Sequence, residues 1–424
     1  MRKLSDASTL GHLLQEQSTW ASVCTEPAMV ALAAAKAARV LGEPPQSIEV
    51  HLSSGILKNA LSAGLPNTAE KGPEVAAALG ALSADPDKGL TILGSATDDL
   101  LDLALEMVAS GKVAVYWARE RQGVYGKCVV RGAHHTAEAV IENSHTNFTE
   151  VLLDGESAQT CATEARTSDL TVLRGWNIPR LLEAVFSIET SWAEWLLQGA
   201  RSCVKLAESS KDPSSPDTIS PAWVCSSPSC ETSIIDVVDS VSRAISARMG
   251  GVSWPVVTSG GSGNQGIMVS VPVMLLARQF SLDDDRVIRA LLIAHSVNLF
   301  IKAYMGEVSC SCGGVSAAAG VAAATCWMRG GSPIQIEEAI SQVIASLFGM
   351  ICDGAKATCA LKGTTSVLTG MLTGAGASQY EGSVRDQGVL GRTLEETLNR
   401  VAVLNSQVIN RSDELMLETI RPGK

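Results

Sequence analysis

Two cysteines, Cys352 and Cys359, stand seven positions apart on either side of an Asp-Gly pair. In a regular α-helix this spacing places both side chains on one face but roughly 10 Å apart along the axis, too far for two thiols to hold one compact centre. Gly354 can leave the right-handed backbone region without steric cost. We therefore expect a helix to end near Cys352, a turn at Gly354 and a metal centre; the alternative is two buried cysteines in a core helix.

Composition limits the kind of protein this is. Eleven cysteines form an odd number in a chain whose N-terminus has no secretory pattern, so reduced thiols or metal ligands are expected rather than structural disulfides. A net charge of −11 provides no basic field for nucleic acid. The longest apolar runs, 269–276 and 317–324, are too short or too glycine-rich to span a bilayer. We expect a cytoplasmic protein with no nucleic-acid or membrane partner.

The residue pattern predicts an α+β fold. Hydrophobic residues make up 46% of the chain but aromatic residues only 4%, and alanine and glycine are abundant, which favours helices packed through small side chains. Alternating patterns predict strands at 48–52, 112–117, 127–130, 137–141 and 151–153, with helices at 74–82 and 96–109. We expect a mainly helical domain, residues 1–42 and 176–424, with an inserted α/β subdomain at 43–175. A single helix is expected over 393–419.

Cys24 precedes a segment that is typical of a helix start. Thr25 can cap the helix, Pro27 suits the first turn, and an alanine-rich run follows. The positive end of a helix favours the thiolate form of a cysteine, which can act as a base, nucleophile or ligand. The alternative is a cysteine that fills space beside the cap.

The glycine-rich stretch 258–267 precedes an apolar helix expected at 268–278. Its backbone amides can face an anion at the helix N-terminus, and Ser262, Asn264 and Gln265 add side-chain donors. The stretch matches neither the P-loop nor the dinucleotide-binding pattern. A small carboxylate fits it as well as a phosphate does, and the alternative is a flexible turn.

Other polar clusters are ambiguous. Asn59 follows Lys58, and His145 and Asn147 lie close together, on segments expected to be loops; each could bind a small polar ligand, but turn chemistry is the commoner reason for such clusters. Cys225 and Cys230 have a spacing that zinc permits, but no second pair follows, so we interpret them as incidental thiols in a surface loop.

Five cysteines at four places in the chain stand out together: Cys24, the Cys310/Cys312 pair, Cys352 and Cys359. Thiols in a reducing compartment with no histidine at ligand spacing indicate an iron–sulfur cluster or structural zinc. Zinc generally uses two tight pairs, whereas only one tight pair is present here. A cluster with three protein ligands leaves one iron open to act as a Lewis acid, which indicates a lyase site.

Several blocks of the chain resemble the L-cysteine desulfidase family, which is related to the α-domain of bacterial iron–sulfur L-serine dehydratases. They run in the order expected for that family over nearly the whole chain. The blocks are Cys-Thr-Glu-Pro from Cys24, Lys58-Asn59, Ala-Arg-Met-Gly-Gly from Ala247, Ser-Gly-Gly-Ser-Gly-Asn-Gln-Gly-Ile from Ser259 and Gly-Met-Ile-Cys-Asp-Gly-Ala from Gly349.

The resemblance implies a [4Fe–4S] cluster and an α,β-elimination that converts L-cysteine to pyruvate, ammonia and sulfide without pyridoxal phosphate. It implies Cys352, Cys359 and, rather than Cys310, Cys312 as the cluster ligands. Cys24 corresponds to an active-site cysteine that removes the Cα proton or occupies the open iron when substrate is absent. The implied pocket residues are Asn59, His145, Asn147, Ser262, Asn264 and Gln265.

Two departures from the family pattern leave the substrate open. The glycine loop begins Ser-Gly-Gly where members of the family can have Ser-Asn-Ser, and Gly-Gly follows Cys312. The pocket could therefore be shaped for L-serine or another β-substituted acid, and a non-catalytic metal or redox-sensing protein is the alternative from another class. We expect a small amino-acid substrate as the partner, and a homo-oligomer is left open.

Overall fold

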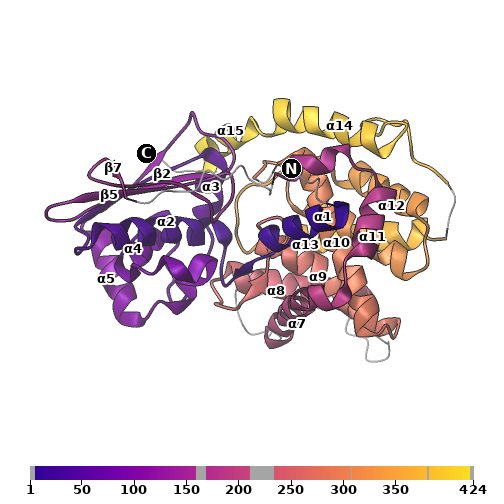
Figure 1. Ribbon diagram of the computed structural model, residues 1–424, viewed down its shortest axis with the longest axis horizontal. Coiled ribbons are helices and arrows are strands. Elements are labelled where there is room, and N and C mark those ends of the chain that lie inside the picture. The colour runs from indigo at the N-terminus through magenta and orange to yellow at the C-terminus, as the bar shows by residue number, and fades with distance from the viewer. Residues whose placement is uncertain (1–4, 159–168, 211–233, 307, 380–381, 421–424) are drawn as a thin grey trace.

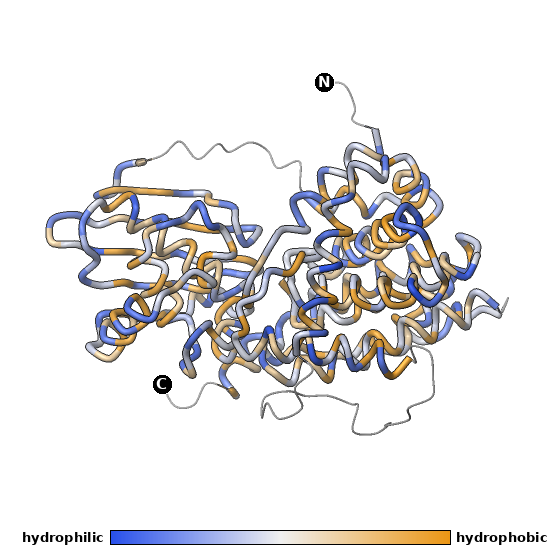
Figure 2. The backbone as a smooth tube through the Cα atoms, turned by 90° about the horizontal axis from the view of Figure 1, so that it is seen from below, coloured by the Kyte–Doolittle hydropathy of each residue, from blue (hydrophilic) through white to orange (hydrophobic). Residues whose placement is uncertain are grey.

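The computed structural model describes residues 5–158, 169–210, 234–306, 308–379 and 382–420 (Figure 1). It shows an α+β fold that is mainly helical, as predicted, with a sheet-bearing part and a helical part that also lie side by side in the view of Figure 2. Cys225 and Cys230 lie outside the described residues, so their interpretation stays a prediction.

The sheet-bearing part forms where the sequence alternates between apolar and polar residues. Every predicted strand and both predicted helices of this region are present, with bounds shifted by a few residues. The elements are β2 (Ser47–Leu52), α3 (Ser54–Ala60), α4 (Pro73–Ser83), the 3₁₀ segment η1 (Pro86–Ser95), α5 (Asp98–Ala109), β3 (Val113–Trp117), β4 (Tyr125–Arg131), β5 (Thr136–Glu142), β6 (Phe148–Leu153) and β7 (Glu156–Ser157).

The strands form one mixed sheet in the order β3-β2-β4-β5-β6-β7. Only β2 and β3 run parallel, with Val50 opposite Val115, and the remaining neighbours are antiparallel. In β2 every second residue is buried, because alternate side chains of a strand point to opposite faces. The helices α4 and α5 lie below the sheet in Figure 1, on the same side as the alanine-rich α2 (Thr25–Leu41).

The packing of α2 differs from the expected grouping of residues 1–42 with the helical domain. Its apolar residues share one buried cluster with the strands and with α4. At the other boundary, Leu170 and Leu173 of the 3₁₀ segment η2 (Leu170–Gly175) join the buried cluster of the helical part. Small alanine side chains let α2 lie close to the sheet, a tertiary preference that helix propensity alone does not reveal. The two-domain division stays a prediction.

The helical part follows from apolar residues at helical spacing between capping residues. It also holds two short strands. Its elements are α1 (Asp6–Gln17), β1 (Trp20–Ala21), α6 (Ile178–Ser187), the 3₁₀ segment η3 (Thr190–Ala193), α7 (Glu194–Ser209), α8 (Ile234–Met249), β8 (Val256–Val257), α9 (Gly263–Gln279), α10 (Asp284–Met305), α11 (Gly314–Met328), α12 (Pro333–Leu347), α13 (Cys359–Ala377), α14 (Leu394–Leu404), the π-helical segment η5 (Asn405–Ile409) and α15 (Ser412–Ile420).

The helix α11 lies at the centre of the helical part and is almost entirely buried. Glycines let its neighbours approach: a Cβ on Gly320 would lie 2.3 Å from the carbonyl oxygen of Ala294, and one on Gly374 of α13 would lie 2.4 Å from the carbonyl oxygen of Ala322. The expected packing through small side chains is therefore present.

One described helix, α10, is long and apolar enough to cross a membrane, but 94% of its apolar window is buried inside the protein. That burial is typical of a core helix. The predicted single helix over 393–419 is wrong, since α14 and α15 are separated by the π-helical segment η5.

A two-stranded ribbon joins the start of the chain to the glycine-rich loop. In it Trp20 pairs with Val257 and Ala21 with Val256 in antiparallel register, so the chain that leaves β8 for Ser262 lies beside the chain that enters β1, where Gly261 N donates to the carbonyl oxygen of Gln17 at 3.1 Å. Residues more than two hundred positions apart are thereby brought to one place.

Two glycines of α13 allow a test of the helix packing. We expect Gly374→Ala to destabilise the protein by about 1–3 kcal/mol, because its Cβ would overlap the backbone of α11. Gly376→Ala should instead stabilise it by about 0.5–1 kcal/mol, because no atom lies within 4 Å of a Cβ there. Thermal unfolding of both variants measures the difference, and equal unfolding temperatures would contradict the close packing of α11 and α13.

Candidate functional site

A cavity of about 120 Å³ is lined by residues from both parts of the molecule. All of the predicted site residues except Asn147 line this one cavity. Cys24 lies at the start of α2 and packs in the buried cluster of the helical part. From the sheet-bearing part come Asn59 and His145, and from the helical part come Ser262, Asn264, Gln265, Cys312, Cys352 and Cys359. Residues chosen from separate segments of the sequence thus meet in space.

Asn147 is not among the described residues that line the cavity, which corrects its predicted placement. Its side-chain amide donates to the carbonyl oxygen of Glu142 at 3.0 Å, within the turn between β5 and β6. The side chain holds the turn that carries His145, and this is the turn chemistry common for asparagine.

Cys24 sits at the start of α2, where its surroundings oppose the effect expected of the helix end. Cys24 itself is the N-cap residue, in place of the expected Thr25, and its side chain makes no capping bond. The thiol donates to Oε2 of Glu26 at 3.1 Å. Burial raises the pKa of Cys24 well above its usual value, and the neighbouring Glu26 charge raises it further. Burial and the carboxylate outweigh the helix dipole.

Glu26 is a carboxylate at the centre of a hydrogen-bond network that the sequence did not reveal. Its Oε2 accepts from Cys24 and from the hydroxyl of Thr25, and its Oε1 accepts from Asn59 Nδ2 at 2.9 Å. Burial alone would raise the pKa of Glu26, but nearby His145 and the hydrogen bonds from Cys24 and Asn59 lower it. The carboxylate is therefore held in its ionised form beside the Cys24 thiol.

Arg248, at the end of α8, brings a buried cation to the same cavity. Its side chain donates to the carbonyl oxygen of Val23 and, at 3.0 Å, to Oδ1 of Asn264. The Nε atom is buried and has no partner in the described part of the chain. Arg248 belongs to the Ala-Arg-Met-Gly-Gly block that resembles the family, but it was not predicted as a site residue.

The glycine-rich loop is a turn that ends in the capped start of α9, and this helix begins at Gly263, before the expected Met268. The Ser262 hydroxyl accepts from the backbone N–H of Gln265, so it caps the helix. Gly260 has φ of 57° and its carbonyl oxygen accepts from Lys302 Nζ at 2.7 Å. The early helix start places Asn264 and Gln265 on the first turn.

The segment before α11 pairs with the segment between α12 and α13. Cys312 N donates to the carbonyl oxygen of Met350 at 2.8 Å, and Cys352 N donates to that of Cys310 at 2.6 Å. Cys312 lines the cavity, whereas Cys310 is buried with its thiol 3.7 Å from the Cys352 carbonyl oxygen. With this backbone pairing, Cys312 lines the cavity and Cys310 does not.

The turn predicted at Gly354 is present, with φ of 100°. The preceding helix ends at Leu347, somewhat earlier than expected, and the next helix begins at Cys359. Lys58 supports this loop: its ammonium donates to the Cys352 carbonyl oxygen at 2.8 Å and forms a buried ion pair with Asp413 of α15. The cysteine loop is thus tied to both α3 and the last helix.

The three thiols fit a polynuclear centre better than a single ion. Within the described ranges, no group of three His, Cys, Asp or Glu side chains has the spacing of a single-metal site. Yet Cys312, Cys352 and Cys359 line one cavity, and burial, followed by the charges of the other two thiols, raises the pKa of Cys312 to about 12. A cluster with several irons needs a wider set of thiolates than a single ion does and supplies the positive charge that three thiolates require.

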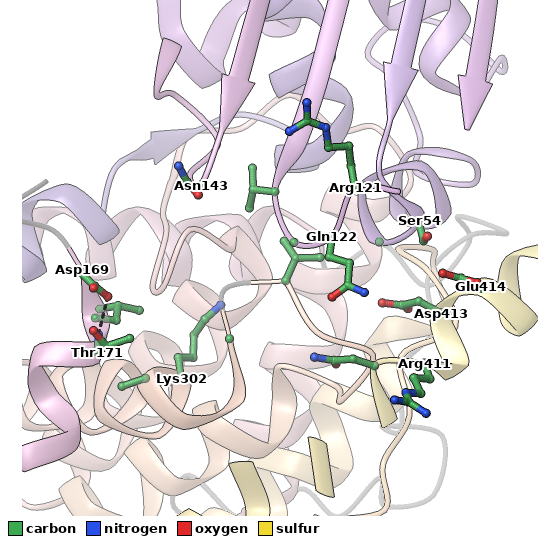
Figure 3. A pocket seen from close by; sticks show the side chains of 18 of the residues that line it. Ser54, Arg121, Gln122, Asn143, Asp169, Thr171, Lys302, Arg411, Asp413 and Glu414 are labelled. Carbon is green, nitrogen blue, oxygen red and sulfur yellow. Dashed lines mark hydrogen bonds between the residues drawn. The ribbon is translucent and has the colours of Figure 1, made fainter. Parts of the chain in front are cut away.

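A larger cavity of about 920 Å³ shares Lys302, Gly306 and Val308 with the thiol-lined cavity. Figure 3 shows Arg121 and Asn143 from the sheet-bearing part facing Arg411 and Asp413 across it. Its described lining holds no cysteine or histidine. The predicted site residues, Asn147 excepted, line the smaller cavity instead.

A model of the serine dehydratase alpha chain family matches residues 133–418, more than half of the chain. The chain belongs to this family. A UPF0597 protein of Moorella thermoacetica is 36% identical over 400 residues, 94% of each chain. UPF0597 proteins of Oleidesulfovibrio alaskensis and Clostridioides difficile are each 32% identical, over 425 and 410 residues, and the matches cover 96% and 94% of this chain and 96% and 95% of theirs.

Membership of the serine dehydratase alpha chain family supports a lyase of the dehydratase type. The matched residues include the glycine-rich loop and the three cavity thiols, whereas Cys24 and Glu26 precede them. The expected relation to the iron–sulfur L-serine dehydratase α-domain is thereby confirmed.

Two residues of the site, Glu26 and Arg248, carried weak signals in the sequence. An acidic residue in a first helical turn is usually explained by the helix dipole, and an arginine in a last turn likewise. The burial of Arg248 and the hydrogen bonds that Glu26 accepts from Cys24 and Asn59 distinguish these two residues from such surface charges.

The contact between Cys24 and Glu26 can be tested in iron-free protein. Glu26→Gln removes the carboxylate charge that raises the pKa of Cys24, while the amide oxygen of glutamine can still accept from the thiol. The pKa should fall, and alkylation of Cys24 by iodoacetamide, read by peptide mass spectrometry, should become fast at a lower pH. Cys128, whose pKa burial alone raises to about 12, is the internal control. An unchanged Cys24 profile would show that the carboxylate does not act on the thiol.

Proposed function

We propose that this protein is an iron–sulfur lyase that eliminates the β-substituent of an L-amino acid, with L-cysteine as its substrate. The observation that carries the proposal is the meeting of Cys312, Cys352 and Cys359 with Cys24 and the ionised Glu26 at one small cavity. A cytoplasmic location and a homo-oligomeric state stay predictions.

The three thiols would hold a [4Fe–4S] cluster, a kind of cofactor with which this family is generally associated. When bound, the cluster supplies positive charge that acts as a Lewis acid without a redox change. The ammonium of Lys362 lies near the thiols and donates to the Ile351 carbonyl oxygen at 2.7 Å, while it also pairs with Asp353. It supports the loop and offsets part of the thiolate charge.

Cys24 and Glu26 are the groups of this chain that can move the Cα proton. The thiol is protonated at rest, because burial and Glu26 raise its pKa. As Cys24 takes the Cα proton, its own proton passes to the Glu26 carboxylate, 3.1 Å away. The C–H electron pair becomes the carbon–carbon double bond while the bond from Cβ to sulfur breaks, and sulfide leaves with that bonding pair. Aminoacrylate then hydrolyses to pyruvate and ammonia.

Anaerobic reconstitution followed by product assays tests this function. We expect cluster absorbance and equimolar sulfide and pyruvate from L-cysteine, with slower turnover of L-serine. Cys24→Ala should keep the cluster and lose turnover by about 100-fold or more, as is usual for removal of a positioned proton-transfer group.

The alternatives give other results. Faster turnover of L-serine would identify a dehydratase of the family's named type. A cluster without turnover of either amino acid would favour the redox-sensing alternative, and a reconstituted protein without cluster absorbance would refute the proposal. Cys310→Ala is the matched control for Cys312→Ala, because Cys310 does not line the cavity: only Cys312→Ala should lose iron.

Gly354→Val should reduce cluster retention before it affects the fold. Valine is strained at φ of 100°, at a cost of about 1–3 kcal/mol, and its Cβ would lie 2.8 Å from the carbonyl oxygen of Lys58. Gly349→Val is the control, because no atom lies within 4 Å of a Cβ at that position. The iron-to-protein ratio after desalting, compared with the unfolding temperature, measures the effect; equal iron content in both variants would contradict it.

A further inference from the structure

Arg248 is a buried cation with hydrogen-bonding capacity that the described part of the chain does not use. Only 2% of the residue is exposed. A guanidinium has five N–H donors, and the bonds to Val23 and Asn264 leave Nε without a partner. Both partners are neutral. No described carboxylate lies within ion-pair distance of Arg248.

Another buried arginine of the same helix shows the usual compensation. Arg243 lies five positions earlier on α8, donates to Oδ2 of Asp239 at 2.7 Å and also bonds the Ala207 carbonyl oxygen. Buried charges are ordinarily paired in this way, because an unpaired buried charge loses its hydration and gains no compensating interaction. Arg248 departs from that pattern, and it does so at the cavity wall.

The surroundings of Arg248 favour an anion beside it. A Cβ on Gly263 would lie 2.5 Å from the guanidinium carbon, so the side chain lies against the first residue of α9. The positive end of this 17-residue helix adds to the field of the guanidinium. The other described cations of the cavity are engaged, Lys362 with Asp353 and Lys302 with the Gly260 carbonyl oxygen.

We propose that Arg248 binds the α-carboxylate of the amino-acid substrate. An arginine offers paired N–H donors that match a carboxylate, and the ionised Glu26 repels a carboxylate from its own side of the cavity. Arg248 lines the same small cavity as Cys24 and Glu26. A carboxylate held there therefore places Cα within reach of the proton-transfer pair. The assignment rests on the proposed function only for the identity of the substrate as an amino acid.

Binding of a non-reacting amino acid tests the assignment apart from catalysis. L-Alanine lacks a leaving group, and L-alaninamide has the same shape but no carboxylate charge. In anaerobic calorimetry with the reconstituted protein, we expect L-alanine to bind and L-alaninamide to bind much more weakly. Arg248→Lys should weaken L-alanine binding roughly 10- to 100-fold, the range for lost hydrogen bonds to a charged group.

Matched variants separate this effect from damage to the fold. Arg243→Lys alters a buried arginine of the same helix away from the cavity and should leave L-alanine binding unchanged. Gly263→Ala keeps Arg248 but displaces its guanidinium, and should weaken L-alanine binding with little effect on L-alaninamide. If Arg248→Lys does not fold, the binding of L-alanine and L-alaninamide to Gly263→Ala provides the test.

Three results would overturn the assignment: no L-alanine binding to the parent protein, equal affinity for L-alanine and L-alaninamide, or unchanged L-alanine affinity in the folded variant. Failure of the proposed lyase function would give a different result. In that case no sulfide or pyruvate forms, but L-alanine binding that depends on Arg248 still supports the carboxylate site.

Discussion

The backbone pairing between residues 310–312 and residues 350–352 is the interaction on which the candidate site depends. It holds two loops together just before α11 and α13, and those helices pack against each other through glycines. Cys312 and Cys352 therefore take their positions from a rigid core rather than from the loops themselves. Sites supported in this way hold their ligands more accurately than sites on free loops.

Charge is distributed across the cavity by the two parts of the protein. The helix α2, which packs on the sheet, contributes the anion Glu26, while the helical part contributes Arg248 and the three cavity thiols. In a buried site such charges act strongly on each other, because little water screens them. Burial and the neighbouring Glu26 raise the pKa of Cys24, whereas the charge of Arg248 acts to lower it. Each part alone would carry buried charge without its counterpart.

Much of the fold and of the site could be predicted from local patterns. Strand alternation, the small-residue helices and the turn at Gly354 are encoded by neighbouring residues. The blocks that resemble the family predicted which distant residues share the cavity. The placement of α2 on the sheet, the protonated state of Cys24 and the charges of Glu26 and Arg248 could not be predicted, because they depend on burial and on contacts between distant segments. Asn147 was misplaced because a turn asparagine and a ligand-binding one look alike in sequence.

The buried ion pair between Lys58 and Asp413 gives the end of the chain a part in the site. The same ammonium donates to the carbonyl oxygen of Cys352, so one lysine joins the last helix to the thiol loop. Removal of α15 would leave that ammonium without its carboxylate, and its most direct remaining contact is the loop that carries Cys352. Trimming the C-terminus would therefore first disturb the position of the thiols, which lie far along the chain from the cut.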